Sequence, residues 1–228
     1  MVESMVNRRI LLLSVGLVAL LAVVNATVFT YRWLTGTVYV YGPETAAVYG
    51  CVGFYSTKDQ PDLETYLPEA GTNYDAQVLG TDTNIEVTRG DEVCLIPSTG
   101  NNKLYESISA LFNVTVGSWY IQDFYGFGYY AESETAPAVY VYLRVESTDM
   151  SSVATNATLI VFRNTTTGWE FVASLDLLNA GEMTSAISLP VNSSLRLDLY
   201  IDASATGTGA FKVGFYVTPE AGETPTPP

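Results

Sequence analysis

Apolar and polar residues alternate with a period of two along most of this 228-residue chain. In Leu195-Arg-Leu-Asp-Leu-Tyr-Ile-Asp202 every second residue is aliphatic, and Val139–Glu146 and Phe211–Thr218 follow the same pattern. Successive side chains of a strand point to opposite faces, so the alternation predicts strands with one face in a core and the other in water. We find no convincing pattern for a long helix.

Further strand candidates are rich in β-branched and aromatic residues: Ala46–Tyr55, Asn84–Thr88, Glu92–Ile96, Ser118–Phe124, Thr158–Arg163, Trp169–Leu175 and Thr184–Pro190. Leu104–Val116 can be read as helical, but its last three residues favour a strand. The polar stretch Ser56–Ala76 contains two prolines and is predicted to be a long surface loop. Many short strands separated by turn signals predict an all-β fold, a jelly-roll-like β-sandwich.

The N-terminus has the features of an export signal. Arg8 and Arg9 precede an apolar run, Ile10–Val24, and Val24-Asn25-Ala26 has the small-x-Ala form of a cleavage site. We predict a signal peptide at residues 1–26. The alternative is an uncleaved anchor, because adding Asn25–Phe29 gives about 20 residues, enough to span a bilayer. Either interpretation places the body outside the cytoplasm, secreted or at the cell surface.

Residues 27–41 follow the cleavage site directly and are predicted to be a strand, ahead of a sandwich domain at 42–217 and a mobile Pro/Thr-rich tail at 218–228. In a monomer the aromatic face of this strand would leave an exposed patch, whereas in a neighbour's groove it would gain hydrogen bonds and burial. A head-to-tail contact of this kind builds a filament. The predicted polymerisation residues are Val28, Phe29, Tyr31, Trp33 and Leu34. The alternative is an ordinary first strand of the sandwich.

Composition narrows the function classes. The net charge of −14 and only three lysines argue against a nucleic-acid partner. The chain has no His, which removes the commonest general base and metal ligand. No catalytic motif is present, although a two-carboxylate hydrolase carries no local signature. We therefore predict no enzymatic activity and no cofactor. Calcium is the one ion left open, at an acidic loop with Asp59, Asp62, Glu64, Glu69 and Asp75.

Cys51 and Cys94 are an even pair in an exported chain, which favours a disulfide over two buried thiols. Glycan attachment is predicted at one or more Asn-x-Ser/Thr sequons: Asn113, Asn156, Asn164 and Asn192, with Asn25 lost on cleavage. Asn164 and Asn192 lie in predicted turns that accommodate a glycan, whereas Asn113 lies in an apolar run and is expected to be partly buried.

Two short segments have competing interpretations. The aromatic run Trp119–Tyr130 has rings that could stack on sugars, or it is a core strand followed by an aromatic loop loosened by glycines, or an interface patch. The Arg89-Gly90-Asp91 triplet invites an adhesion interpretation, but its composition is that of a plain turn.

A resemblance follows from this organisation. The strand Thr27-Val-Phe-Thr-Tyr-Arg-Trp-Leu-Thr-Gly-Thr-Val-Tyr-Val40, directly after the signal segment and ahead of the sandwich, resembles the start of archaeal bundling pilins and, more distantly, TasA/camelysin-type biofilm fibre subunits. The resemblance implies a homopolymer built by donor-strand complementation, serving adhesion or biofilm formation, with membrane contact only through the N-terminal segment before cleavage. The alternative is a membrane-anchored surface β-domain that binds glycans or other surface partners.

Overall fold

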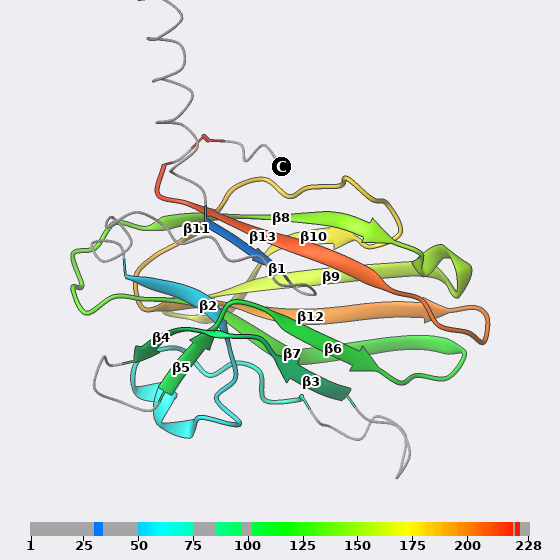
Figure 1. Cartoon of the computed structure of the whole chain (residues 1–228), viewed down its shortest axis with the longest axis horizontal. Coiled ribbons are helices and arrows are strands. Elements are labelled where there is room, and N and C mark those ends of the chain that lie inside the picture. Colours follow the sequence, from blue (N-terminus) through cyan, green and yellow to red (C-terminus); the bar gives the residue numbers. More distant parts are fainter. Residues whose placement is uncertain (1–29, 34–49, 75–84, 97–101, 221, 224–228) are drawn as a thin grey trace, which may run out of the picture.

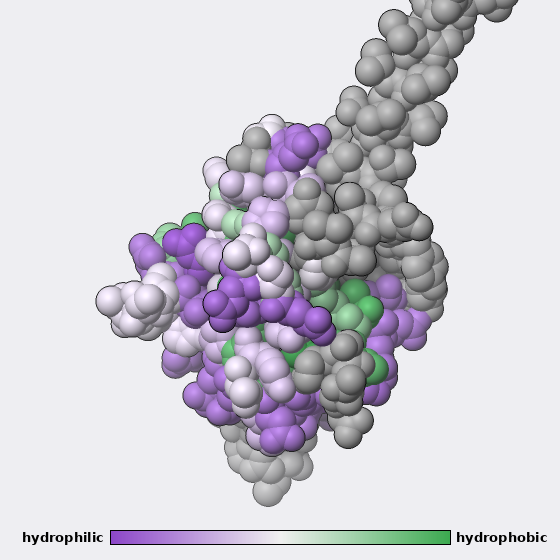
Figure 2. Space-filling model, turned by 90° about the vertical axis from the view of Figure 1, so that its left-hand side faces the viewer, coloured by the Kyte–Doolittle hydropathy of each residue, from purple (hydrophilic) through white to green (hydrophobic). Residues whose placement is uncertain are grey.

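The predicted all-β sandwich is confirmed. The structure, a computed structural model, describes residues 30–33, 50–74, 85–96, 102–220 and 222–223. Within these residues two antiparallel sheets pack face to face (Figure 1). The face of the molecule shown in Figure 2 is largely hydrophilic, with hydrophobic residues gathered in small areas.

The smaller sheet has four strands in the order β1-β13-β8-β11. These strands are β1 (Thr30–Trp33), β13 (Phe211–Thr218), β8 (Val139–Thr148) and β11 (Ile187–Leu189). The larger sheet has seven strands in the order β10-β9-β12-β7-β2-β5-β4. These are β10 (Gly168–Asp176), β9 (Ala154–Thr165), β12 (Ser193–Ala203), β7 (Gly117–Tyr130), β2 (Cys51–Tyr55), β5 (Asn102–Tyr105) and β4 (Glu92–Ile96). A two-stranded ribbon pairs β3 (Ile85–Arg89) with β6 (Ile108–Phe112).

The core lies between the two sheets and is built from the alternating apolar positions. Leu195, Leu197 and Leu199 of β12 are completely buried there with the aliphatic residues of β8. Phe215 of β13 bridges the sheets, because its ring centroid lies 4.9 Å from that of Phe54 and 4.8 Å from that of Phe127. Each such side chain stabilises the fold by about 1.5–3 kcal/mol through burial.

The chain crosses between the sheets repeatedly. β8 and β13 belong to the smaller sheet, whereas β9 and β12, their neighbours in sequence, belong to the larger one. Short 3₁₀ turns, η1 (Pro61–Thr65) and η3 (Met150–Ser152), are the only helical elements within the described residues. Such crossings are typical of Greek-key sandwiches.

The expectation of a polar surface loop after β2 was incomplete. The described part, Ser56–Tyr74, is here named the cover segment, and it buries Leu63, Leu67 and Ala70 in a second core with Tyr55. This core lies on the outer face of the larger sheet, where Gly126 and Gly128 leave room for the Tyr55 ring. A Cβ on either glycine would approach Tyr55 Cε1 to 2.9 Å.

Other expected boundaries also shifted. The interpretation of residues 125–130 as a loosened loop was wrong, because β7 continues to Tyr130 and its glycines are strand residues. The stretch Leu104–Val116 contains the end of β5 and all of β6, but its last three residues, which were expected to form a strand, lie between β6 and β7. The strand expected at Thr184–Pro190 is limited to β11, Ile187–Leu189.

Candidate functional site

The predicted polymerisation strand is partly described. Tyr31 and Trp33 lie in β1, whereas Val28, Phe29 and Leu34 lie outside the described residues. β1 runs antiparallel to β13 of the same chain, with Thr30 opposite Val217 and Trp33 opposite Gly214 (Figure 1). In the single chain, the N-terminal strand therefore occupies an edge position of the smaller sheet.

β13 provides the edge on which β1 lies. Its inward residues are core residues, and its outward Tyr216 is buried with Tyr142. The Tyr216 hydroxyl donates a hydrogen bond to Glu146. Burial raises the pKa of Tyr216, and the hydrogen bond to Glu146 raises it further. Without β1, the stretch Gly214–Val217 would present unpaired backbone N–H and C=O groups. This β13 edge, Gly214–Val217, can therefore take a strand of its own chain or of another copy.

A buried polar network lies on the outer face of the larger sheet. Asp198 of β12 is 0% exposed. Its carboxylate accepts hydrogen bonds from Arg196 Nε at 3.0 Å and Nη2 at 3.1 Å, and from the backbone N–H of Asp123 at 2.8 Å. The Tyr120 hydroxyl donates to the same carboxylate. A fully buried charge is thus paired and hydrogen-bonded, as burial requires.

Asp123 extends this network to the cover segment. It lies in the bulge where β7 loses register with β12, with a φ of 53°, a left-handed conformation that Asp tolerates better than most residues. Its carboxylate accepts hydrogen bonds from Gly71 N at 2.7 Å and from the Thr72 hydroxyl at 2.6 Å. Burial raises the pKa of Asp123, against the opposing effect of these donors. The bulge therefore fastens the cover segment to the sheet.

Beside the cover segment, the larger sheet exposes aromatic rings. Phe171 of β10 lies opposite Phe162 of β9, with ring centroids 6.1 Å apart, and Phe162 lies opposite Arg196. The Arg196 guanidinium stacks 4.5 Å from the Phe162 ring and 5.4 Å from the Trp169 ring. Phe171 is 57% exposed and Tyr120 is 52% exposed. We name Tyr120, Phe162, Trp169, Phe171 and Arg196 the outer aromatic face.

Of the interpretations of the aromatic run Trp119–Tyr130, the structure supports the core strand. In the run Trp119–Tyr130, the rings of Phe124, Tyr125, Phe127 and Tyr129 are buried, and Tyr120 is the one large exposed ring. The outward positions of β9 and β10 carry the others. The alternating pattern itself contained this signal, because Phe162 and Phe171 fall on the side opposite the buried aliphatic residues.

The predicted disulfide between Cys51 and Cys94 is confirmed. It joins β2 to β4, with the two Cα atoms 6.4 Å apart and 43 residues between the positions in sequence. Both cysteines are partly buried against the second core.

The sequons differ in exposure from what the sequence suggested. Asn113 is exposed, so its expected partial burial was wrong, and Asn156 is exposed as well. Asn164 and Asn192, expected in open turns, are half-buried and their side chains accept backbone hydrogen bonds. Asn25 lies outside the described residues.

The acidic loop does not converge on one point. Asp59 forms an ion pair with Arg89, while Asp62, Glu64 and Glu69 are exposed, and Asp75 lies outside the described residues. In the described part of the chain, no three His, Cys, Asp or Glu side chains form a cluster that could hold a metal ion. Arg89 of the Arg-Gly-Asp triplet is half-buried and donates to the Tyr125 hydroxyl at 3.1 Å, so it is tied into the fold.

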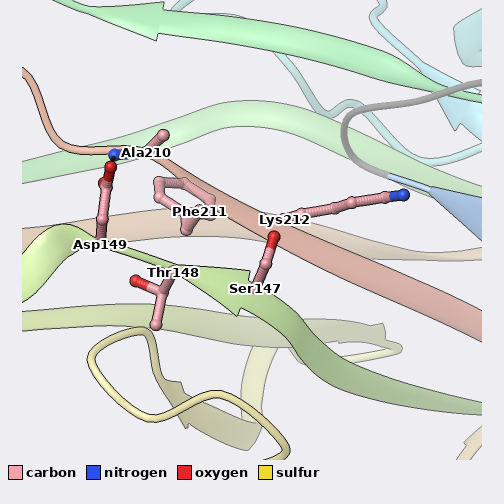
Figure 3. A pocket seen from close by; sticks show the side chains of 6 residues that line it. All are labelled: Ser147, Thr148, Asp149, Ala210, Phe211 and Lys212. Atoms are coloured by element: carbon pink, nitrogen blue, oxygen red, sulfur yellow. Dashed lines mark hydrogen bonds between the residues drawn. The ribbon is translucent and has the colours of Figure 1, made fainter.

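A shallow hollow of about 340 Å³ lies where β8 ends beside the start of β13 (Figure 3). It is lined by Ser147, Thr148, Asp149, Ala210, Phe211 and Lys212. The Asp149 carboxylate accepts the backbone N–H of Ala210, and the Lys212 side chain points away from it. Its polar groups therefore do not converge on a common point.

Comparisons of the chain with protein-family models, with curated proteins and with solved structures found no match. No helix among the described residues is long and apolar enough to cross a membrane, and the apolar run Ile10–Val24 lies outside them. The two candidate surfaces are therefore the β13 edge and the outer aromatic face.

Proposed function

We propose that this protein is a structural subunit of an extracellular filament or pilus that serves adhesion or biofilm formation. In the filament, the N-terminal strand of one copy pairs with the β13 edge of the next copy. The observation that carries the proposal is the position of β1, which among the described residues lies at a sheet edge and pairs with β13 alone. A strand at a sheet edge can leave without breaking the other ladders of the smaller sheet, β13 with β8 and β8 with β11.

The chain length permits the exchange. Sixteen residues, 34–49, separate Trp33 of β1 from Gly50, which directly precedes β2 of the larger sheet. A connection of that length can reach roughly 55 Å when extended. A compact domain of this size is about 40 Å across. The N-terminal strand of one copy can therefore reach the β13 edge of a neighbour.

Energetics then decide between the closed monomer and the filament. The same register pairs, from Thr30 with Val217 to Trp33 with Gly214, form in either case. The strand tethered to its own domain has an effective concentration of about the millimolar range, so dilute protein favours closure. Filaments are expected where the local concentration is high, as at a secreting surface, and further contacts of the exchanged segment would shift the balance toward them.

Cysteine pairs at register positions test the exchange. Thr30→Cys combined with Val217→Cys places two thiols opposite each other across the β1–β13 ladder, within the range that a disulfide spans. Ser147→Cys combined with Lys212→Cys is the matched control, because these residues are opposite each other in the β8–β13 ladder of one chain. Each variant is concentrated, oxidised and run on a denaturing gel without reductant, beside electron microscopy of the same sample.

We expect a covalent ladder of multimers from the Thr30/Val217 variant and cross-linked monomers from the control. The multimers should return to monomers on reduction. Cross-linked monomers from both variants in samples that contain filaments would refute strand exchange, because the filaments would then form through another contact.

A second candidate is supported by the outer aromatic face. Exposed rings beside a planar guanidinium suit stacking on sugar rings, so this surface supports the alternative of a cell-surface β-domain that binds glycans. The Arg196 charge is balanced by Asp198, and the chain is acidic overall, so neutral glycans fit best. Binding to neutral polysaccharides that Phe171→Ala abolishes would favour this candidate, whereas unchanged binding would remove it.

A further inference from the structure

Four sequons follow the predicted cleavage site, and the fold presents them unequally. N-glycan transfer joins a sugar to the Asn side-chain nitrogen and requires a Ser or Thr hydroxyl two residues later. A folded protein can carry a glycan only where the Asn side chain reaches solvent, and transfer to a folded chain also requires an accessible hydroxyl. Exposure of these two groups can be compared across the sequons that begin at Asn113, Asn156, Asn164 and Asn192.

The sequon at Asn192 is withheld by the fold. Asn192 has a φ of 55°, a left-handed conformation that few residues other than Asn, Asp and Gly adopt. Its side-chain oxygen accepts the backbone N–H of Ala131 at 3.2 Å. The hydroxyl of this sequon belongs to Ser194, which is fully buried. Asn192 therefore shapes the turn into β12 and its hydroxyl partner is out of reach.

The sequon at Asn164 is also engaged. Its side-chain oxygen accepts the backbone N–H of Ser194 at 2.8 Å, which ties β9 to β12. Asn164 lies opposite Trp169 in the β9–β10 ladder and is half-buried. A glycan on this amide would have to leave a crowded position between the indole ring and the neighbouring strand.

Asn113 and Asn156 meet both requirements. Asn113 and its partner Thr115 are both exposed. Asn156 is exposed, and the hydroxyl of Thr158 donates to the Asn156 side-chain oxygen at 3.0 Å. The hydroxyl that the transfer requires therefore already lies beside the acceptor amide in this second sequon.

We propose that Asn113 and Asn156 are the N-glycan acceptors of this protein, and that Asn164 and Asn192 remain unmodified as structural residues. Asn113 directly follows β6, and Asn156 is the third residue of β9. β6 ends and β9 begins at the end of the sandwich opposite the one where β1 starts (Figure 1). Glycans at these positions would therefore leave the β13 edge clear.

The proposal rests on export, which the proposed function also requires, but it does not rest on polymerisation. The full chain is expressed with its own N-terminus in yeast, whose secretory pathway transfers N-glycans. The secreted, folded fraction is isolated, and each sequon is scored by mass spectrometry after peptide-N-glycosidase treatment in heavy-oxygen water. Site occupancy is read from the peptides whether or not the protein forms filaments.

We expect heavy-oxygen label at Asn113 and Asn156 and none at Asn164 and Asn192. Asn113→Gln and Asn156→Gln should each increase the mobility of the band on a denaturing gel by the equivalent of one glycan and leave the melting temperature unchanged. Asn164→Gln and Asn192→Gln should leave mobility unchanged and lower the melting temperature, because each breaks a backbone hydrogen bond. Secreted folded protein without sugar at Asn113 or Asn156, or with comparable occupancy at Asn164 or Asn192, would overturn the proposal.

Discussion

Replacing Asp198 with Asn tests whether the buried network holds the outer face of the larger sheet together. The wild-type carboxylate accepts hydrogen bonds from two nitrogens of Arg196, from the Asp123 backbone and from the Tyr120 hydroxyl. Asn keeps one acceptor oxygen and turns an NH₂ group toward some of these donors. It also removes the counter-charge of Arg196, whose side chain is only 11% exposed.

The expected cost is large for a single-atom change. Removing one partner of a buried ion pair costs about 3–5 kcal/mol, because the other charge stays buried without compensation. For a protein of this size, each kcal/mol lowers the melting temperature by about 2–4 °C. The predicted loss is therefore roughly 10 °C in melting temperature, together with a lower urea midpoint at an unchanged slope.

Glu170→Gln is the matched control. It removes a carboxylate from the same sheet but from its other face, where its partner Arg163 is 3.7 Å away and the Glu170 side chain is 63% exposed. Exposed pairs contribute about 0–1 kcal/mol. Urea titrations of both variants, with hydrogen exchange at Gly71 and Thr72, measure the difference. If Asp198→Asn costs no more than Glu170→Gln, the network does not stabilise this face and the argument from burial is wrong.

Two further predictions concern links to the second core. Replacing Cys51 and Cys94 by Ser should cost about 4 kcal/mol, since the disulfide closes a loop of 43 residues, and the urea midpoint measures this; a loss below 1 kcal/mol would contradict it. Burial raises the pKa of Asp123 in the fold, so the folded state binds this proton more tightly than the unfolded state. Asp123 therefore favours folding more below about pH 4, its unfolded pKa, and that contribution falls as pH rises through the folded pKa. Asp123→Asn should accordingly destabilise more at pH 4 than at pH 7 in paired urea titrations, and an equal or opposite difference would contradict the assigned direction.

The alternating pattern predicted the strands well because burial in a sandwich acts on every second residue. Leu195, Leu197 and Leu199 follow the pattern without exception and are all buried. The disulfide was also predictable, because the N-terminal residues predict export and an even cysteine pair outside the cell has few alternatives. Both predictions rest on patterns that are local in the sequence.

The features that the sequence analysis did not predict depend on contacts between residues far apart in the sequence. Nothing near Leu63 or Leu67 indicates that Tyr55 and the strand glycines 126 and 128 would offer a surface for them. The bulge at Asp123 is similar, because its hydrogen-bond partner Asp198 lies 75 residues away. The burial of two leucines in a polar segment and of a carboxylate in a strand can be recognised only from the tertiary structure.

For the N-terminal strand, the sequence predicts the strand but not the chain with which it pairs. Its β-branched and aromatic residues predict a strand that needs an edge, and β13 provides one. The register pairs are the same whether the edge belongs to its own chain or to a neighbour, so neither the residue pattern nor the fold of one copy distinguishes closure from exchange. The difference lies in the tether and in the concentration of free edges. The assembly state is therefore a property of conditions as well as of sequence, and the Thr30/Val217 cross-link measures it where the two arrangements differ, in whether one chain or two are joined.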